Sequence, residues 1–299
     1  MRILELVGNT PLLELGNIAA DVPEVRLFAK AEFCNPSGSV KDRAAKAMIL
    51  DGIDRGALTR GKTIIDATSG NTGIAYAMIG AALGYDVTLY MPKNASLERH
   101  RIIHNYGAKI VMTDPLEGSD GALLAVRDAV KSSPDRYFYP DQYNNRANMR
   151  AHYETTGVEI WEQTGHEITH FITGLGTSGT FMGVSKRLKE CSNARTIAVQ
   201  PDSPFHGIEG TKHIDSTIRP GIYDESLIDS VITVTTESAR DMTRRLAKEE
   251  GIFVGISSGA NVSAAISLAR TLPGGSVVVT VLCDNGGRYL SDSFWDNEK

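Results

Sequence analysis

The chain has 299 residues, and 31 lysines and arginines stand against 36 aspartates and glutamates, so its formal net charge is −5. This charge argues against a dedicated nucleic-acid-binding protein, which usually carries a strong basic excess. No apolar run approaches the ~20 residues that a membrane-spanning helix needs. The three cysteines (Cys34, Cys191 and Cys283) are odd in number and far apart, which argues against a disulfide framework or a zinc site. We therefore expect a cytoplasmic protein of roughly two domains that binds neither nucleic acid nor membrane.

Short β-rich runs alternate with helical stretches along the chain. The first helix is expected from Lys41 to about residue 53, followed by strands at 63–67, 86–91 and 109–112 and helices at 74–83, 97–106 and 121–131. Beyond a polar stretch at 143–149, the pattern predicts strands at 170–173, 196–200, 231–234 and 276–283 and helices at 181–191, 238–250 and 261–272. Continuous apolar strands that alternate with helices are typical of parallel sheets covered on both faces, so we expect an α/β fold. The segment 201–223 predicts a long loop.

One kind of turn occurs three times, each time where a helix is about to begin. The three turns are 68–73 (TSGNTG), 174–180 (GLGTSGT) and 255–260 (GISSGA). The first N–H groups of a helix have no partner within it, and the helix dipole favours negative charge there. Serine and threonine are also ordinary helix caps. Three such turns at one edge of parallel sheets nevertheless predict a site for a ligand with several separate acceptor groups.

The second turn fits the spacing G-x-G-x-x-G of a dinucleotide site. Its glycines are Gly174, Gly176 and Gly179. A dinucleotide site also needs an acidic residue about 20 positions further on, and Gln200 and Pro201 stand there instead. The loop carries three hydroxyls, on Thr177, Ser178 and Thr180. They suit a terminal phosphate, so we rank a phosphate-monoester cofactor above NAD and keep a nucleotide-binding protein as the remote alternative.

Lys41 occupies an unusual position in the segment 35–43 (NPSGSVKDR). It lies in the first turn of an expected helix, where the dipole disfavours a cation. The dipole, burial and the neighbouring Arg43 would lower its pKa towards a neutral, nucleophilic amine suited to Schiff-base chemistry. The alternative, and the commoner fate of a single lysine, is a solvated side chain paired with Asp42.

These segments, with GNTPL at 8–12 upstream, resemble in their order the cysteine synthase (O-acetylserine sulfhydrylase) family. The resemblance covers almost the whole chain, and the segments 222–224 (IYD) and 283–290 (CDNGGRYL) are similar to the cysteine synthase B branch, which includes O-phosphoserine sulfhydrylases. It implies the tryptophan synthase β-type fold (fold type II), the cofactor pyridoxal 5′-phosphate, and a homodimer. It also implies a smaller α/β domain of residues 35–148 and a larger cofactor-binding domain of 1–34 with 149–299.

The resemblance also implies a role for each matching residue. Lys41 would form the internal aldimine and then act as general base, Asn71 would bind the cofactor's 3′-oxygen, and Ser257 would face the pyridine nitrogen, with Asp284 as a rival. The phosphate cup would comprise Gly176, Thr177, Ser178, Gly179 and Thr180. The amino-acid substrate would be bound by Thr68, Ser69, Asn71, Thr72 and Gln142, and by Lys212 if it carries a phosphate.

The implied reaction is β-replacement, in which an O-activated L-serine and sulfide give L-cysteine through an α-aminoacrylate. O-acetylserine is the family's usual substrate. Lys212 keeps O-phosphoserine open, with His206, His213 and Arg219 as further cations and Glu209 and Asp215 as offsetting charges. Cystathionine β-synthase, cysteine desulfhydrase and dehydratase activities on the same scaffold stay alternatives. His100 and His104 have a spacing that can bind metal, but without a third ligand we expect no metal site.

Overall fold

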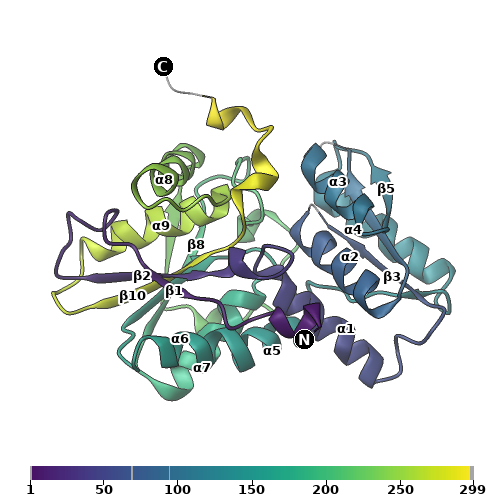
Figure 1. The fold of residues 1–299 in the computed structure, drawn as a ribbon, viewed down its shortest axis with the longest axis horizontal. Helices are drawn as coiled ribbons and strands as arrows, with labels where there is room; N and C mark the ends of the chain where they lie inside the picture. Colours follow the sequence, from purple (N-terminus) through teal and green to yellow (C-terminus); the bar gives the residue numbers. More distant parts are fainter. Residues whose placement is uncertain (1, 69, 94, 297–299) are drawn as a thin grey trace.

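The computed structural model of the protein describes residues 2–68, 70–93 and 95–296. Its strands form two sheets, seen side by side in Figure 1. The larger has six strands in the order β1-β2-β10-β7-β8-β9, and all neighbouring strands in it are parallel except β1 and β2. The smaller has four parallel strands in the order β5-β4-β3-β6. The expected α/β class with mainly parallel sheets is confirmed.

The strands are β1 (Leu12–Glu14), β2 (Arg26–Ala31), β3 (Thr63–Ala67), β4 (Val87–Pro92), β5 (Lys109–Thr113), β6 (Tyr137–Phe138), β7 (His170–Gly174), β8 (Arg195–Pro201), β9 (Ser230–Val234) and β10 (Val277–Leu282). The α-helices are α1 (Lys41–Asp54), α2 (Asn71–Leu83), α3 (Leu97–Asn105), α4 (Gly118–Ser132), α5 (Arg146–Ala151), α6 (Gly157–Gln163), α7 (Gly179–Cys191), α8 (Thr236–Glu249) and α9 (Ile256–Ala269). A π-helical turn, His152–Thr156, joins α5 to α6.

Both faces of the larger sheet are covered, which explains why its strands read as continuous apolar runs. Along β10, Val278 and Leu282 enter the core beneath α8 and α9, whereas Val279 and Val281 enter the core beneath α6 and α7. The smaller sheet is built in the same way, with α1 and α2 packed on one face and α4 on the other. Successive side chains of a strand point to opposite faces, so a strand between two helical layers buries nearly every residue.

Two of the differences between the structure and the sequence expectations concern helices. The polar stretch at 143–149 is not only a connection, because Asn145 caps a helix there: its Oδ1 accepts a hydrogen bond from the backbone N–H of Ala147 (2.9 Å), and α5 follows. The helices expected at 74, 181 and 261 begin earlier, at Asn71, Gly179 and Ile256. Their first turns therefore include the last residues of the three hydroxyl- and glycine-rich motifs. No helix in the described part of the chain is long and apolar enough to cross a bilayer.

The two sheets use separate stretches of the chain. The smaller sheet lies within residues 63–138, and the larger takes its strands from 12–31 and 170–282. Helix α5 packs against both α1 and α7 and so connects the two units. The boundaries 35–148 and 1–34 with 149–299 remain a prediction.

Candidate functional site

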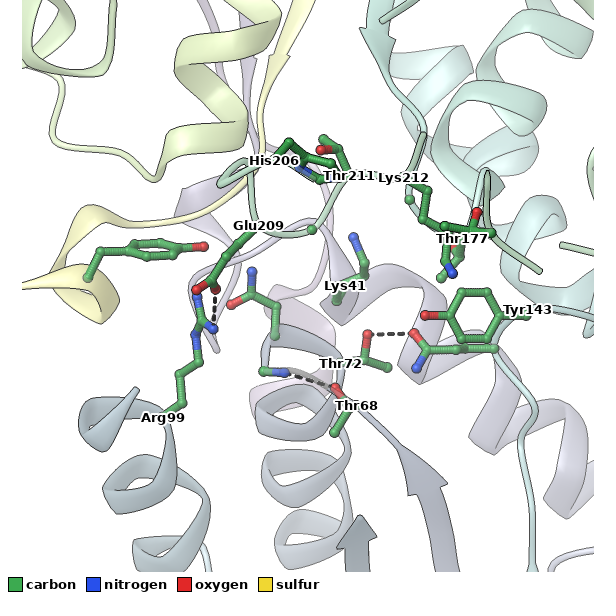
Figure 2. Close-up of a pocket in the computed structure, with 17 residues that line it drawn as sticks. Lys41, Thr68, Thr72, Arg99, Tyr143, Thr177, His206, Glu209, Thr211 and Lys212 are labelled. Carbon is green, nitrogen blue, oxygen red and sulfur yellow. Dashed lines mark hydrogen bonds and ion pairs between the residues drawn. The ribbon is translucent and has the colours of Figure 1, made fainter. Parts of the chain in front are cut away.

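Side chains from both sheet units meet at one cavity of about 280 Å³ (Figure 2). Of the residues expected in a site, it is lined by Lys41, Thr68, Asn71, Thr72, Gln142, Gly176, Thr177 and Lys212. A smaller cavity of about 40 Å³ shares four of these residues and adds Ser178, Thr180 and Ser257. The structure thus brings the expected residues together, with Gly179 opening α7 beside them. Ser69 lies outside the described residues, and the roles assigned to the others remain predictions.

Lys41 is the first residue of α1, and its side chain enters both cavities (Figure 2). Its neighbour Asp42 is fully buried and turns the other way, accepting hydrogen bonds from the backbone N–H (2.6 Å) and the hydroxyl of Ser37. Burial raises the pKa of Asp42 to about 6. The alternative in which Lys41 pairs with Asp42 is therefore wrong.

Arg43 also points away from the cavity. Its guanidinium forms ion pairs with Glu32 (2.7 Å) and Glu159 (2.6 Å), and Glu159 also binds Lys30 (2.6 Å). Burial alone would raise the pKa of Glu159, but the hydrogen bonds and positive charges of Arg43 and Lys30 together outweigh this and lower it to about 2. The expectation that Arg43 acts on Lys41 needs correction, because two carboxylates already balance its charge. The cluster anchors the first turn of α1.

The turn before α2 offers hydroxyl and amide groups to the larger cavity. The Oγ1 of Thr68 accepts hydrogen bonds from the backbone N–H groups of two later residues in the turn (3.1 and 3.2 Å), so its proton is available to a ligand. Thr72 donates its proton to Gln142 (2.8 Å), and the amide of Gln142 donates to the carbonyl of Ala67 (2.8 Å). This network holds the turn in the orientation in which its groups face Lys41 in Figure 2.

The turn before α7 lines the smaller cavity. Thr177 Oγ1 accepts a hydrogen bond from the amide of Asn148 (3.0 Å), which leaves its own proton free. Thr180 Oγ1 lies 3.3 Å from Nε2 of His152, a fully buried histidine whose pKa burial lowers to about 3, so that it stays neutral. Ser178 has a positive φ of 66° and donates its hydroxyl to the carbonyl of Thr177 (2.6 Å). Of the three expected hydroxyls, that of Ser178 is thus already committed, and it can offer a ligand only its backbone N–H.

Two glycines of this turn are required by close packing. A Cβ on Gly176 would lie 2.3 Å from the carbonyl oxygen of Gly210, and one on Gly179 would lie 2.0 Å from Oδ1 of Asn148. Any side chain at either position would displace the backbone or the amide that shapes the cavity.

Ser257 and Asp284 were both candidates for the group that faces the pyridine nitrogen of the cofactor, and they take different positions in the structure. Ser257 is buried in the first turn of α9 and lines the smaller cavity together with Cys283. Burial raises the pKa of the Cys283 thiol to about 11, which keeps it protonated. The Asp284 carboxylate lines neither cavity and instead accepts hydrogen bonds from Asn71 (2.6 Å) and the hydroxyl of Tyr289 (2.6 Å). The geometry therefore favours Ser257 as the group that faces a ligand.

The segment 206–212 forms one wall of the larger cavity. The backbone N–H of Lys212 donates to the carbonyl of Leu175 (2.6 Å), which ties this segment to the turn before α7. The Lys212 ammonium lies 4.0 Å from Asp120 and 5.0 Å from the ring centre of Tyr143, and burial lowers its pKa. His206 also lines the cavity.

The other two expected cations lie elsewhere. His213 is half-buried and hydrogen-bonded to Ser216, and Arg219 lies near Asp215 (3.8 Å) and over the ring of Tyr223. Neither lines the cavity, so the expectation that they contribute charge to it is wrong.

Sequence reasoning missed one prominent pair. Arg99 of α3 is 3% exposed and forms an ion pair with Glu209, with its guanidinium 4.7 Å from the ring centre of Tyr289. Figure 2 shows this pair across the cavity from Thr177. Helix α3 is polar along much of its length, so nothing in the sequence distinguishes Arg99 from its neighbours.

Among the described residues, no group of three or more His, Cys, Asp or Glu side chains could hold a metal ion. Helix α3 carries both histidines of the metal-like spacing, His100 and His104.

Comparison with known proteins agrees with this geometry. A family described as "Pyridoxal-phosphate dependent enzyme" matches residues 3–284. The chain is 54% identical to a cysteine synthase of Aquifex aeolicus, covering 99% of this chain and 92% of the relative, and 42% identical to a cysteine synthase B of Salmonella typhimurium, covering 100% and 97%. The crystal structure of an O-ureido-L-serine synthase superposes with a TM-score of 0.93 at 39% identity, covering 100% of this chain and 96% of that one. The expected fold type II is thereby confirmed, and the chain belongs to the family of pyridoxal-phosphate-dependent enzymes.

Proposed function

We propose that this protein is a cysteine synthase that makes L-cysteine from an O-activated L-serine and sulfide by pyridoxal-phosphate-dependent β-replacement. The observation that carries the proposal is Lys41, which enters a cavity built from the N-terminal turns of α2, α7 and α9. The 54% identity of the chain to a cysteine synthase, over 99% of its residues, supports the same activity.

The residues present fit pyridoxal 5′-phosphate. Gly176 and Gly179 let the Gly210 carbonyl and the Asn148 amide pack closely against the turn that lines the smaller cavity, and the first N–H groups of α7 lie at this turn. Those groups and the hydroxyls of Thr177 and Thr180 would hold the phosphate. The Asn71 amide would bind the 3′-oxygen, the Ser257 hydroxyl would face the ring nitrogen, and Lys41 would bind the aldehyde carbon. When bound, the cofactor supplies an electron sink that stabilises negative charge at the substrate's α-carbon.

The chain's own groups then bind and orient the amino acid. The Thr68 hydroxyl and the N-terminus of α2 would receive its α-carboxylate, with Gln142 holding Thr72 in place. We propose Ser69 as a further contact on the basis of the family resemblance. Lys41 Nζ would take the α-proton as general base. A serine at the ring nitrogen cannot keep that nitrogen charged by ion pairing, which favours loss of the β-substituent over a long-lived carbanion.

For the activated serine we propose O-acetylserine. The Arg99 charge in the cavity is balanced by Glu209, and the Lys212 ammonium lies near Asp120 (4.0 Å). Little uncompensated positive charge is thus left for a phosphate dianion, and a lysine binds phosphate less specifically than an arginine does. Steady-state kinetics with both substrates tests this. If O-phosphoserine is preferred and Lys212→Ala abolishes that preference, O-acetylserine is the wrong assignment.

The proposed Schiff base is tested by borohydride reduction of the yellow holoenzyme and peptide mass spectrometry. We expect the reduced cofactor on Lys41 and none in Lys41→Ala. Lys46→Ala is the matched control, since that lysine belongs to the same helix but binds the carbonyl of Leu4 outside the cavity. A purified protein that binds no cofactor after reconstitution would refute the proposal.

A screen of acceptors separates the alternatives. Homocysteine in place of sulfide would reveal cystathionine β-synthase activity, and sulfide release from cysteine would reveal a desulfhydrase. O-ureido-L-serine belongs among the products measured, because the similar solved structure carries that name. Cysteine as the dominant product is the result that we expect.

We also propose that the enzyme is a cytoplasmic homodimer, with domains at 35–148 and 1–34 plus 149–299. The family resemblance supports the dimer, and the separate chain segments of the two sheets support the domain division. Sedimentation velocity on the holoenzyme tests the dimer.

A further inference from the structure

The amide of Asn71 is held between opposite charges. Its Nδ2 donates to the fully buried carboxylate of Asp284 (2.6 Å), and its Oδ1 accepts from the guanidinium of Arg288. Arg288 is itself fixed by a hydrogen bond to the backbone carbonyl of Ser37, and Asp284 by one from the hydroxyl of Tyr289 (2.6 Å). Both partners of the amide are therefore anchored independently of it.

This arrangement permits one orientation of the amide only. An arginine has no acceptor and a carboxylate has no donor, so a rotated amide would set donor against donor and acceptor against acceptor. The amide nitrogen carries two protons, and Asp284 takes one of them. Asn71 lines both cavities, and its second N–H is free to donate to a ligand, whereas its oxygen already accepts a hydrogen bond from the cationic Arg288.

The buried position of Asp284 lowers the stability of the fold, because one of its carboxylate oxygens has no hydrogen-bond partner among the described residues. This oxygen is Oδ1, and it is buried. Such an unsatisfied group usually costs stability, and natural proteins keep few of them. A carboxylate retained under these conditions points to a task elsewhere in the site.

Resting on the proposed cofactor, we infer that Asp284 is a positioning residue: with Arg288 it locks the Asn71 amide so that it presents a hydrogen-bond donor, and never an acceptor, to the 3′-oxygen of pyridoxal 5′-phosphate. A fixed donor favours the deprotonated form of that oxygen. Asp284 acts through Asn71 and touches no reacting atom.

The test is titration of the apoenzyme with pyridoxal 5′-phosphate, together with the absorption spectrum of the bound cofactor. In Asp284→Asn the second side chain can donate as well as accept, so the orientation of Asn71 is no longer unique. We expect about tenfold weaker cofactor binding and a shift from the visible absorption band to the near-ultraviolet band. The matched control is Asp66→Asn, because Asp66 is also fully buried and also accepts from a tyrosine hydroxyl (2.9 Å, Tyr76) but lines neither cavity. It should bind the cofactor within about twofold of wild type.

Two comparisons isolate the action through Asn71. With 3-deoxypyridoxal 5′-phosphate, in which hydrogen replaces the ring hydroxyl, Asp284→Asn should bind as tightly as wild type. In an Asn71→Ala background, Asp284→Asn should cause no further loss. If the variant does not fold, as judged by circular dichroism of the apoenzyme, Asp284→Ser serves in the same comparisons.

A loss that persists undiminished with the deoxy analogue or without Asn71 would overturn the inference, since Asp284 would then act on the ring nitrogen or on the fold. Equal binding and equal spectra of wild type and Asp284→Asn would also overturn it. Failure of the wild-type protein to bind pyridoxal 5′-phosphate at all would instead refute the proposed function.

Discussion

The buried cluster around Arg43 predicts a large loss of stability from a single charge change at Glu32. This carboxylate is fully buried and binds Arg43 through both oxygens, at 2.7 Å to Nη2 and 2.8 Å to Nε. It also accepts from Thr10 (2.7 Å) and Asn35 (2.8 Å). Glu32→Gln keeps the volume but turns an NH2 group towards one of these donors and leaves Arg43 with one carboxylate partner, Glu159.

Breaking a buried ion pair from one side costs about 3–5 kcal/mol. That is a large part of the ~5–15 kcal/mol by which proteins of this kind are stable. The matched control is Glu249→Gln, whose carboxylate pairs with Arg245 on the surface of α8, with side chains 38% and 43% exposed. An exposed pair of this spacing contributes about 0.3–0.5 kcal/mol.

The measurement is urea unfolding of the apoenzyme and the holoenzyme, followed by circular dichroism. Because Arg43 lies two positions after Lys41 in α1, we also expect weaker cofactor retention in Glu32→Gln. A loss of less than about 1 kcal/mol, or one equal to that of the surface control, would refute the view that this cluster anchors the lysine's helix.

Three further predictions concern single residues. Burial raises the pKa of Asp66 from 3.8 to about 7, so the stability from its protonated form is full below pH 3.8 and falls as the pH rises from there, until it is lost at about pH 7. Asp66→Asn should flatten this fall in melting temperature between about pH 4 and 7. Gly176→Ala would set a Cβ 2.3 Å from the Gly210 carbonyl and should abolish cofactor absorbance, whereas Gly16→Ala, with nothing within 4 Å, should leave it unchanged. With a pKa of about 11, the Cys283 thiol should outnumber its thiolate by about a thousandfold at pH 8. Mass spectrometry should therefore find Cys283 alkylated far more slowly than the two exposed cysteines.

The sequence revealed those parts of the fold that depend on local pattern. Long strands such as β10 lie between two helical layers, so they are apolar throughout and can be predicted from their composition. Strand β2 was missed because Arg26 and Lys30 interrupt its apolar run, and only the structure shows that Lys30 is buried against Glu159 (2.6 Å). Helix α5 was missed because its sequence, RANMRA, is polar, and its contacts to α1 and α7 come from distant parts of the chain.

The residues of the candidate site also divide into those that a local motif predicts and those that only the folded chain brings together. The turns that begin α2, α7 and α9 are contiguous motifs, so spacing alone was enough to single them out. Arg99, Glu209 and Tyr289 come from three separate segments and meet only through tertiary packing. Their side chains carry no local signal, because an arginine in a polar helix and a glutamate in a loop are ordinary surface residues until the chain folds.

The order of strands in the larger sheet has a consequence for synthesis of the chain on the ribosome. Among the described strands, β2 pairs with its short antiparallel neighbour β1 and otherwise only with β10 (Val277–Leu282), which is the last of these strands in the chain. The smaller sheet, complete by Phe138, can assemble long before this. The β1–β2 hairpin must therefore wait with an open edge while residues 32–276 are made, and such edges are prone to pair with other chains. Nascent chains that stall before Val277 should accordingly be the species that chaperones have to protect.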